Sequence, residues 1–234
     1  MAKRPIFIPS YSHYPYTKEI IIDFEWYPGF AKIQAQKSIQ SLHNEAKKRG
    51  ISPILEISSK SLDSLGVSLS AFNLMLTIEN LTMSVECAFQ GSKVFKKGGP
   101  YTDLYRSTSI EAKKNVRVKE SGELIGFNFL GMEFPTRPYT LFYDWIYLIA
   151  LSQNPTLSER MLKYCGFSDI AFNPDHSINC QARSAALFVA LSNSSEIEMN
   201  LLISDKNYYL EVMGEKNQQH GRTPKNPNQL GFSF

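Results

Sequence analysis

The sequence predicts a helix-rich α+β fold in a single domain with short strands. Helical segments dominate the chain, the short strands do not alternate regularly with them, and no internal repeat is present. The 234 residues, 43% of them hydrophobic, are enough to bury one sizeable core. Irregular alternation of this kind argues against a doubly wound parallel sheet.

The first third of the chain predicts a strand, a helix and then two further strands. Arg4–Pro9 forms a strand that proline ends, and residues 10–29, rich in Tyr and Pro, form an aromatic loop. Lys32–Arg49 is a helix that Gly50 stops. The expected continuation is a strand at Ile54–Ile57, a Ser- and Gly-rich loop at Ser58–Ser70 and a strand at Leu74–Ile78.

The remainder is mostly helical. Ser84 can cap a helix that runs to about Phe95, before Gly98-Gly99-Pro100 breaks it. The other expected elements are a basic helix at Ser109–Lys119, a hairpin about Leu130-Gly131, and helices at Thr140–Gln153, Thr156–Tyr164 and Cys180–Leu191. We expect residues 1–194 to form the domain. Residues 195–234 are a C-terminal extension, with a short hairpin at 199–213 followed by a mobile polar tail.

Composition excludes several function classes. A net charge of +3 is too small for binding to nucleic acid by charge alone. Three scattered cysteines and four scattered histidines predict no disulfide framework and no metal site, and a reduced cytoplasm fits best. No apolar run has transmembrane length, so no membrane is expected. Glycine-rich dinucleotide and Walker motifs are absent, and no cofactor is expected.

One decapeptide contains the candidate catalytic residues. In Ser84–Lys93, the side chains of Glu86, Gln90 and Lys93 fall at i, i+4 and i+7, on one stripe of the predicted helix. A carboxylate, an amide and an amine on a half-buried ridge can move protons and hold a polar ligand. An ordinary surface ion pair would have the same spacing.

Three motifs in order resemble the NADAR superfamily (YbiA-like). They are Leu69–Asn73, Ser84–Lys93 and Glu111–Lys114. Further stretches resemble a longer bacterial subgroup that serves as antitoxins to DarT-like DNA ADP-ribosyltransferase toxins, at Ile22–Phe30, Leu55–Ser61, Gly98–Tyr105, Phe142–Tyr147 and Ser177–Ser184. The resemblance spans about residues 4–191. It departs from the family at Cys87, where the family has His, and at Arg117, an uncertain equivalent of the motif arginine.

The resemblance implies an ADP-ribosyl glycosidase that removes ADP-ribose from guanine bases in DNA. Its implied partners are ADP-ribosylated guanine, ADP-ribose and a cognate DarT-like toxin. Glu86 would be the acid/base. Two routes stay open for Lys93: attack on a ring-opened imine to form a Schiff base, or simple binding of phosphate or hydroxyls during direct hydrolysis.

The other expected site residues support these two groups. Gln90 would hold ribose hydroxyls, and Asp144 would be a second acid/base group or the partner of Arg183. Candidate contacts to ADP-ribose are Ser59, Ser61, Gly66, Phe72, Trp145 and Arg183, with Trp26 as a base-stacking candidate. Some of these residues also have a structural interpretation: Ser59 and Ser61 as turn residues, Trp145 as core packing, and Asp144 and Arg183 as an ion pair.

Two other function classes compete with this prediction. A non-catalytic antitoxin would bind the toxin or ADP-ribosylated DNA without turnover. An N-glycosidase of small metabolites is the third class, which short YbiA-like relatives suggest and which the longer N-terminal region disfavours.

Overall fold

The computed structural model describes residues 1–11, 14–175 and 177–213. Its largest sheet has the strand order β2-β1-β9-β3. β1 (Ala2–Pro9) pairs antiparallel with β2 (Thr17–Phe24) and with β9 (Gly166–Ser168), while β3 (Ile54–Glu56) runs parallel to β9. α1 (Lys32–Lys48) packs against this sheet through a separate apolar cluster that includes Ile22, Phe24 and Leu42.

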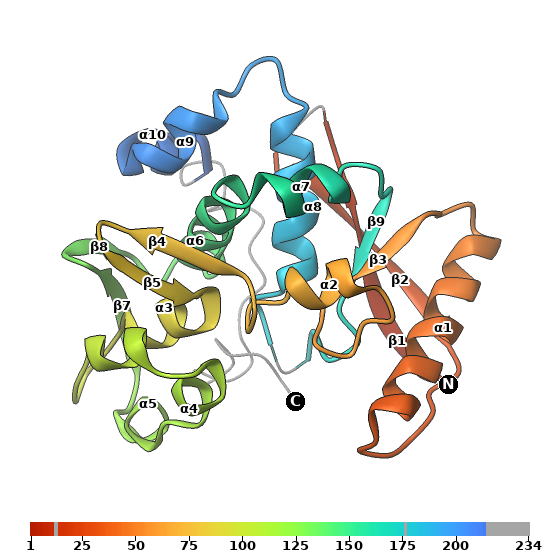
Figure 1. Ribbon diagram of the computed structural model, residues 1–234, viewed down its shortest axis with the longest axis horizontal. Coiled ribbons are helices and arrows are strands. Elements are labelled where there is room, and N and C mark those ends of the chain that lie inside the picture. Colours follow the sequence, from red (N-terminus) through yellow and green to blue (C-terminus); the bar gives the residue numbers. More distant parts are fainter. Residues whose placement is uncertain (12–13, 176, 214–234) are drawn as a thin grey trace.

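Two smaller sheets lie on the other side of the molecule (Figure 1). One is the hairpin of β4 (Met75–Ile78) and β5 (Leu81–Ser84), and the other has the order β6-β7-β8. These strands are β6 (Lys93–Phe95), β7 (Leu124–Phe129) and β8 (Met132–Phe134). Leu130 and Gly131 join β7 to β8 with φ of 51° and 88°, the left-handed pair that a two-residue hairpin turn requires, so this predicted hairpin is confirmed.

Helices fill the space between the sheets. α6 (Leu141–Ser152) is buried along nearly its whole length and packs against both α8 (Gln181–Ser192) and α3 (Val85–Gly91). The remaining helices are α2 (Ser64–Ser68), the 3-10 helix η1 (Thr102–Arg106), α4 (Ser109–Lys114), α5 (Val116–Glu120), α7 (Pro155–Met161), α9 (Met199–Ser204) and α10 (Lys206–Met213). The mixed arrangement confirms the predicted α+β class.

Several predicted boundaries are wrong for local reasons. Residues 17–24 form β2 and not a loop, because the run Ile20-Ile21-Ile22 pairs with β1 and buries Ile22. The predicted loop after β3 contains α2, which the Asp63 side chain caps by accepting from the N–H of Leu65. The predicted basic helix is interrupted at Asn115, whose extended backbone separates α4 from α5.

The predicted hairpin at 199–213 is also wrong, because this segment forms α9 and α10. The predicted turn at its centre is real, but Asp205 accepts from the N–H groups of Asn207 and Tyr208 and so starts a helix. Leu202, Tyr209 and Met213 recur at helical spacing and are buried in the larger apolar cluster, which also contains residues of α3, α6 and α8. The polar tail lies outside the described residues.

Two absences hold within the described ranges. No helix there is long and apolar enough to cross a membrane. No group of three or more His, Cys, Asp or Glu side chains there is placed to hold a metal ion.

Candidate active site

The helix α3, which carries the predicted site residues Glu86 and Gln90, is an interior element. All seven of its residues are buried, and Ser84 caps it by accepting from the N–H of Cys87 at 3.1 Å. The Ser84 hydroxyl also lies 2.8 Å from that of Ser109, which links the start of α3 to α4. Cys87 is buried, donates to the carbonyl of Ser107, and has its thiol pKa raised by burial, so this position packs in the core.

Glu86, Gln90 and Lys93 form one connected group. The Gln90 amide donates to Glu86 Oε1 at 2.8 Å, and Lys93 Nζ donates to Gln90 Oε1 at 2.9 Å. Their exposed fractions are 0%, 3% and 6%, so neither the acid nor the amine points into open solvent. We call these three residues the acid–amide–amine relay.

The spacing predicted that Lys93 lies on the helix, and this prediction is wrong. α3 ends at Gly91, Ser92 is its C-cap, and Lys93 is the first residue of β6, where it pairs with Phe127. The Lys93 side chain nevertheless returns to the end of α3 to bond Gln90. The predicted contact between the Lys93 amine and the Gln90 amide is therefore present, but it does not come from helical spacing.

The surroundings of Lys93 disfavour its charged form. Burial lowers the pKa of Lys93 to about 8; Glu86 opposes this shift and the Lys113 ammonium adds to it. The Phe89 ring, whose centre lies 4.5 Å from Lys93 Nζ, acts in the opposite direction, because an aromatic face attracts the ammonium form. With a pKa of about 8, roughly a tenth of the Lys93 amine is neutral at pH 7, and neutral amines are nucleophilic.

The two side-chain oxygens of Glu86 differ in their hydrogen bonding. Its Oε1 accepts from Gln90, whereas its buried Oε2 has no hydrogen-bond partner within the described residues. A buried carboxylate oxygen left without a donor is costly, and it marks a place where a ligand group can bind.

A second pair of buried carboxylates, Glu56 and Asp169, was missed by sequence reasoning. Glu56 is the last residue of β3 and Asp169 follows β9, so both lie at the adjacent carboxyl ends of this parallel pair. Glu56 accepts from the hydroxyls of Ser58 and Ser168 and from the N–H of Ile170. Glu56 could have been singled out from the sequence, because it lies in the motif Leu55–Ser61. Its pairing with Asp169 could not, because nothing in the sequence shows that β3 and β9 are neighbours.

Asp169 connects to the relay through Gln181. The Gln181 amide donates to Asp169 Oδ2 at 3.0 Å and its oxygen accepts from the N–H of Ala71 at 2.8 Å. The Ala71 carbonyl then accepts from the N–H of Glu86 at 2.9 Å. Burial and the neighbouring Glu56 raise the pKa of Asp169 to about 7. The starts of α3 and α8 are thereby held together.

The residues of the predicted phosphate loop differ in their exposure to solvent. Ser59 is exposed, whereas Ser61 and Gly66 are buried. A Cβ on Gly66 would lie 1.9 Å from the carbonyl oxygen of Glu56, so this glycine permits α2 to approach β3. Phe72 is half-buried and its ring lies 5.5 Å from Lys113 Nζ, on the side of the molecule that carries α4.

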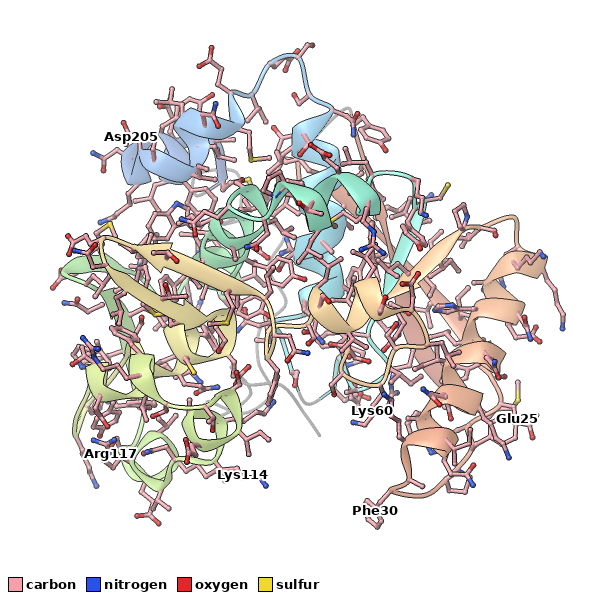
Figure 2. The ribbon with its side chains drawn as sticks, viewed as in Figure 1. Glu25, Phe30, Lys60, Lys114, Arg117 and Asp205 are labelled. Carbon is pink, nitrogen blue, oxygen red and sulfur yellow. The ribbon has the colours of Figure 1, made fainter. Side chains whose placement is uncertain are left out.

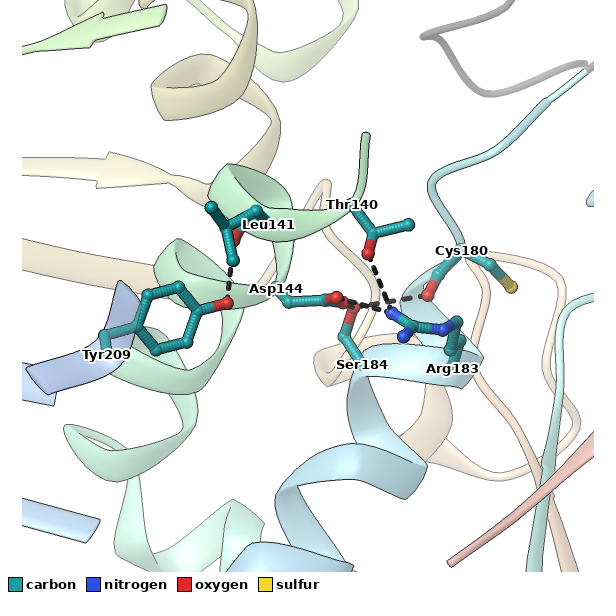
Figure 3. A network of polar contacts seen from close by, with 7 residues as sticks. All are labelled: Thr140, Leu141, Asp144, Cys180, Arg183, Ser184 and Tyr209. Atoms are coloured by element: carbon teal, nitrogen blue, oxygen red, sulfur yellow. Dashed lines mark hydrogen bonds and ion pairs between the residues drawn. The ribbon is translucent and has the colours of Figure 1, made fainter. Parts of the chain in front are cut away.

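Asp144 and Arg183 belong to a separate network between α6 and α8 (Figure 3). Arg183 makes an ion pair with Asp144 and also donates to Thr140 Oγ1 at 3.1 Å. The Ser184 hydroxyl donates to the other Asp144 oxygen at 2.6 Å. The expected pairing of Asp144 with Arg183 is present, and these bonds join two core helices.

The two tryptophans differ in exposure. Trp145 is 2% exposed and packs against Phe134, Phe129 and Tyr209, as expected for core. Trp26 is 39% exposed, with the Arg4 guanidinium 5.4 Å from its ring. Of the two, Trp26 is the one that a nucleobase can reach from solvent.

We expect Arg183→Met to destabilise the fold by about 3 kcal/mol, because Asp144 would remain as a buried charge without its cation. The Arg183 and Asp144 side chains are 16% and 3% exposed. Urea denaturation of the single variant and of the Arg183→Met/Asp144→Leu double variant measures this effect, and the double variant should recover part of the loss. Arg117→Met, which breaks the exposed Arg117–Asp103 pair, is the matched control and should leave the urea midpoint close to that of the native chain.

The structure has the α+β class that the resemblance to the NADAR superfamily implies, and it brings Glu86, Gln90 and Lys93 of the second motif into contact. The family model described as DarT1-associated NADAR antitoxin matches residues 2–223. The chain therefore belongs to the DarT1-associated NADAR antitoxin family. This match extends beyond residue 191, where the motif resemblance ends, and includes α9 and α10. A search of curated proteins found no match.

Proposed function

We propose that this antitoxin is an ADP-ribosyl glycosidase that removes ADP-ribose from guanine bases in DNA and so reverses the modification made by a DarT1-type toxin. The observation that carries the proposal is the relay itself: a buried carboxylate and a buried amine of lowered pKa, joined through one amide. Membership of a DarT1-associated family supports the choice of substrate.

Breaking the ribose–guanine bond needs a proton donor and an acceptor for the anomeric carbon. In the reacting form Glu86 carries a proton and Lys93 is neutral. Glu86 delivers its proton to the ring oxygen, the ring C–O bond breaks, and the exocyclic nitrogen of guanine forms a C=N bond to the anomeric carbon. The neutral Lys93 amine adds to that carbon. Glu86 then moves a proton from the lysine nitrogen to the guanine nitrogen, and the carbon–guanine bond breaks.

The products are unmodified guanine and a Lys93 imine. Water adds to this imine, the carbon–lysine bond breaks, and the released sugar closes to free ADP-ribose. Direct hydrolysis would use Lys93 only to bind the substrate. The lowered pKa of Lys93 favours the covalent route, because a binding cation gains nothing from being partly neutral.

Gln90 keeps the two reacting groups apart and oriented. Its amide donates to the acid while its oxygen accepts from the amine, so one side chain fixes both. A direct Glu86–Lys93 ion pair would stabilise the charged amine, whereas the intervening amide limits that effect. Holding reacting groups in place before substrate binds lowers the entropic part of the barrier.

The proposal is tested with an oligonucleotide that carries one ADP-ribosylated guanine. Incubation with the native protein should release ADP-ribose and restore the unmodified oligonucleotide, both measured by mass spectrometry. Protection of cells from the toxin without any release in vitro, together with co-purification of the toxin, would replace the enzyme with a toxin-binding antitoxin.

The rate of ADP-ribose release by the native chain should fall as the pH rises above about 8. The reacting form needs a proton on Glu86 and none on Lys93, and this single proton is lost as the pH rises through the Lys93 pKa of about 8. The residual rate of Glu86→Gln depends on the neutral Lys93 amine alone, so it should instead rise about tenfold per pH unit below pH 8 and level off above it. Single-turnover rates between pH 6 and 9.5 measure both profiles. Because Asp169 titrates at about 7, the Asp169→Asn variant should keep the fall above pH 8. A Glu86→Gln rate that is flat from pH 6 to 8 would remove Lys93 as the nucleophile.

A further inference from the structure

The motif Gly98–Tyr105 takes no part in the proposed chemistry, yet its first residues lie against the backbone of Lys93. The N–H of Phe95 donates to the Gly98 carbonyl at 2.7 Å, so the chain folds back directly after β6. Gly99 has a φ of 85°, and a Cβ there would lie 2.2 Å from the Lys93 carbonyl oxygen. The motif then continues into η1, which packs against α3. One end of the motif therefore lies beside Lys93, and the other lies beside the helix that carries the rest of the relay.

Tyr105, the last residue of this motif, places a hydroxyl at the end of α3. The hydroxyl oxygen lies 3.0 Å from Ser92 Oγ, and the hydroxyl donates to the carbonyl of Asn128 at 3.3 Å. A Cβ on Gly91 would lie 2.5 Å from the Tyr105 ring, so the glycine at this position permits the ring to approach the helix. Because Tyr105 is only 2% exposed, its hydroxyl must find its polar partners inside the protein.

Ser92 is the residue through which Tyr105 can reach the amine, because it is the C-cap of α3 and directly precedes Lys93. The Ser92 hydroxyl donates to the Ala88 carbonyl at 2.7 Å, and the Ser92 carbonyl accepts from the N–H of Asn128 at 2.7 Å. Ser92 is therefore held from α3, from β7 and, through Tyr105, from η1. These contacts fix the backbone where the helix ends and β6 begins, and this backbone sets the direction in which the Lys93 side chain points.

We propose that Tyr105 is a positioning residue whose hydroxyl acts through Ser92 to hold the Lys93 amine in the relay, which rests on the proposed function and adds a residue to the same site. A phenylalanine would pack against α3 equally well, and a buried hydroxyl is unfavourable unless it has polar partners. Both partners of this hydroxyl adjoin the amine in the fold. Ser92 precedes Lys93 in the chain, and Asn128 follows Phe127, the residue of β7 that pairs with Lys93. What the hydroxyl adds is therefore a restraint on the backbone around the nucleophile.

The effect of Tyr105 on the amine is one of position and not of charge. Burial raises the pKa of the Tyr105 hydroxyl, so Tyr105 is neutral over the working pH range. The charged groups that act on the Lys93 amine are Glu86 of α3 and Lys113 of α4, and removing the Tyr105 hydroxyl changes neither of them. An amine that is held less closely spends more time near water, which raises its pKa toward the ordinary lysine value. Its alignment with the reacting carbon also becomes less exact.

The test compares Tyr105→Phe with the native full-length chain in two measurements. An NMR titration of isotope-labelled lysine gives the pKa of Lys93, whose signal is assigned by its absence from Lys93→Met. This pKa should rise by about 1 pH unit in Tyr105→Phe. Steady-state release of ADP-ribose from the modified oligonucleotide should show kcat lowered by about tenfold and KM near native, because the variant misplaces the amine and leaves substrate binding intact.

Tyr101→Phe is the matched control, because it removes a tyrosine hydroxyl from the same motif. The Tyr101 hydroxyl contacts Ser121, away from the end of α3. The Tyr101 ring lies 4.6 Å from the Arg117 guanidinium, which Figure 2 shows at the edge of the molecule near α5. Tyr101→Phe should therefore keep the native pKa of Lys93 and the native kcat.

A second variant, Ser92→Ala, removes the residue through which Tyr105 acts. It should show the same two effects, and the Tyr105→Phe/Ser92→Ala double variant should lose no more kcat than Ser92→Ala alone, because both changes break one contact. Melting curves establish that each variant is folded. A Tyr105→Phe chain with native pKa and native kcat, or losses that add in the double variant, would overturn the proposal.

The titration needs no substrate, so its outcome separates this proposal from the glycosidase itself. An unchanged pKa of Lys93 in Tyr105→Phe, with native release of ADP-ribose, would remove the positioning role and leave the glycosidase in place. A raised pKa in that variant, without any release by the native chain, would do the reverse.

Discussion

Lys93→Met should reduce the single-turnover release of ADP-ribose by on the order of 10³-fold or more, because it removes the nucleophile and leaves the rest of the relay in place. Methionine fills nearly the same buried volume, so the core around Phe89 and Phe127 should stay packed. Release is followed by mass spectrometry under single-turnover conditions. We also expect a small amine such as methylamine to restore part of the rate, since it can attack the ring-opened imine from solution.

Lys97→Met is the matched control for this variant. Lys97 lies four residues further along the chain and is exposed, so its loss changes the charge without touching the relay. It should release ADP-ribose at the native rate. A Lys93→Met protein with native activity would rule out the covalent route and leave Lys93 at most a binding residue.

Glu86→Gln should slow release by about 10²–10⁴-fold, the usual effect of removing a general acid or base. The glutamine oxygen can still accept from Gln90, so shape and hydrogen bonding change little, whereas no proton can be delivered to the ring oxygen. The loss should fall on kcat and not on KM, because the substitution alters the transition state more than binding.

An exposed glutamate provides the matched control for Glu86→Gln. Glu120→Gln, on the surface of α5, should have native kinetics. Affinity for ADP-ribose should be near native in Glu86→Gln, which shows that the site is folded. Native turnover in Glu86→Gln would mean that another group, with Asp169 the nearest in the hydrogen-bonded path, supplies the proton.

The sequence was informative wherever local rules decide the structure. The capping of α3 by Ser84, the turn at Leu130-Gly131 and the end of α1 near Gly50 follow from residues within a few positions of each other. Elements that depend on tertiary packing were harder. The segment 199–213 contains Tyr and branched residues that favour strands, but burial of Tyr209 and Met213 against the core selects helices.

The same distinction applies to the site. Glu86 and Gln90 are four residues apart on one helix, so their contact could be predicted from spacing. Lys93 belongs to the strand β6, so helical spacing could not predict how its side chain contacts Gln90. Glu56 and Asp169 lie close together only because β3 and β9 are neighbours in space, although the two strands are more than a hundred residues apart in the chain.

Borohydride trapping tests most directly the claim that Lys93 becomes bonded to the sugar. Reducing the reaction mixture during turnover of an ADP-ribosylated oligonucleotide should attach one ADP-ribosyl group to each trapped chain, and peptide mapping should place it on Lys93. The Lys93→Met chain should trap none. Rapid release of ADP-ribose without any trapped adduct, or an adduct on another lysine such as Lys113, would contradict the account.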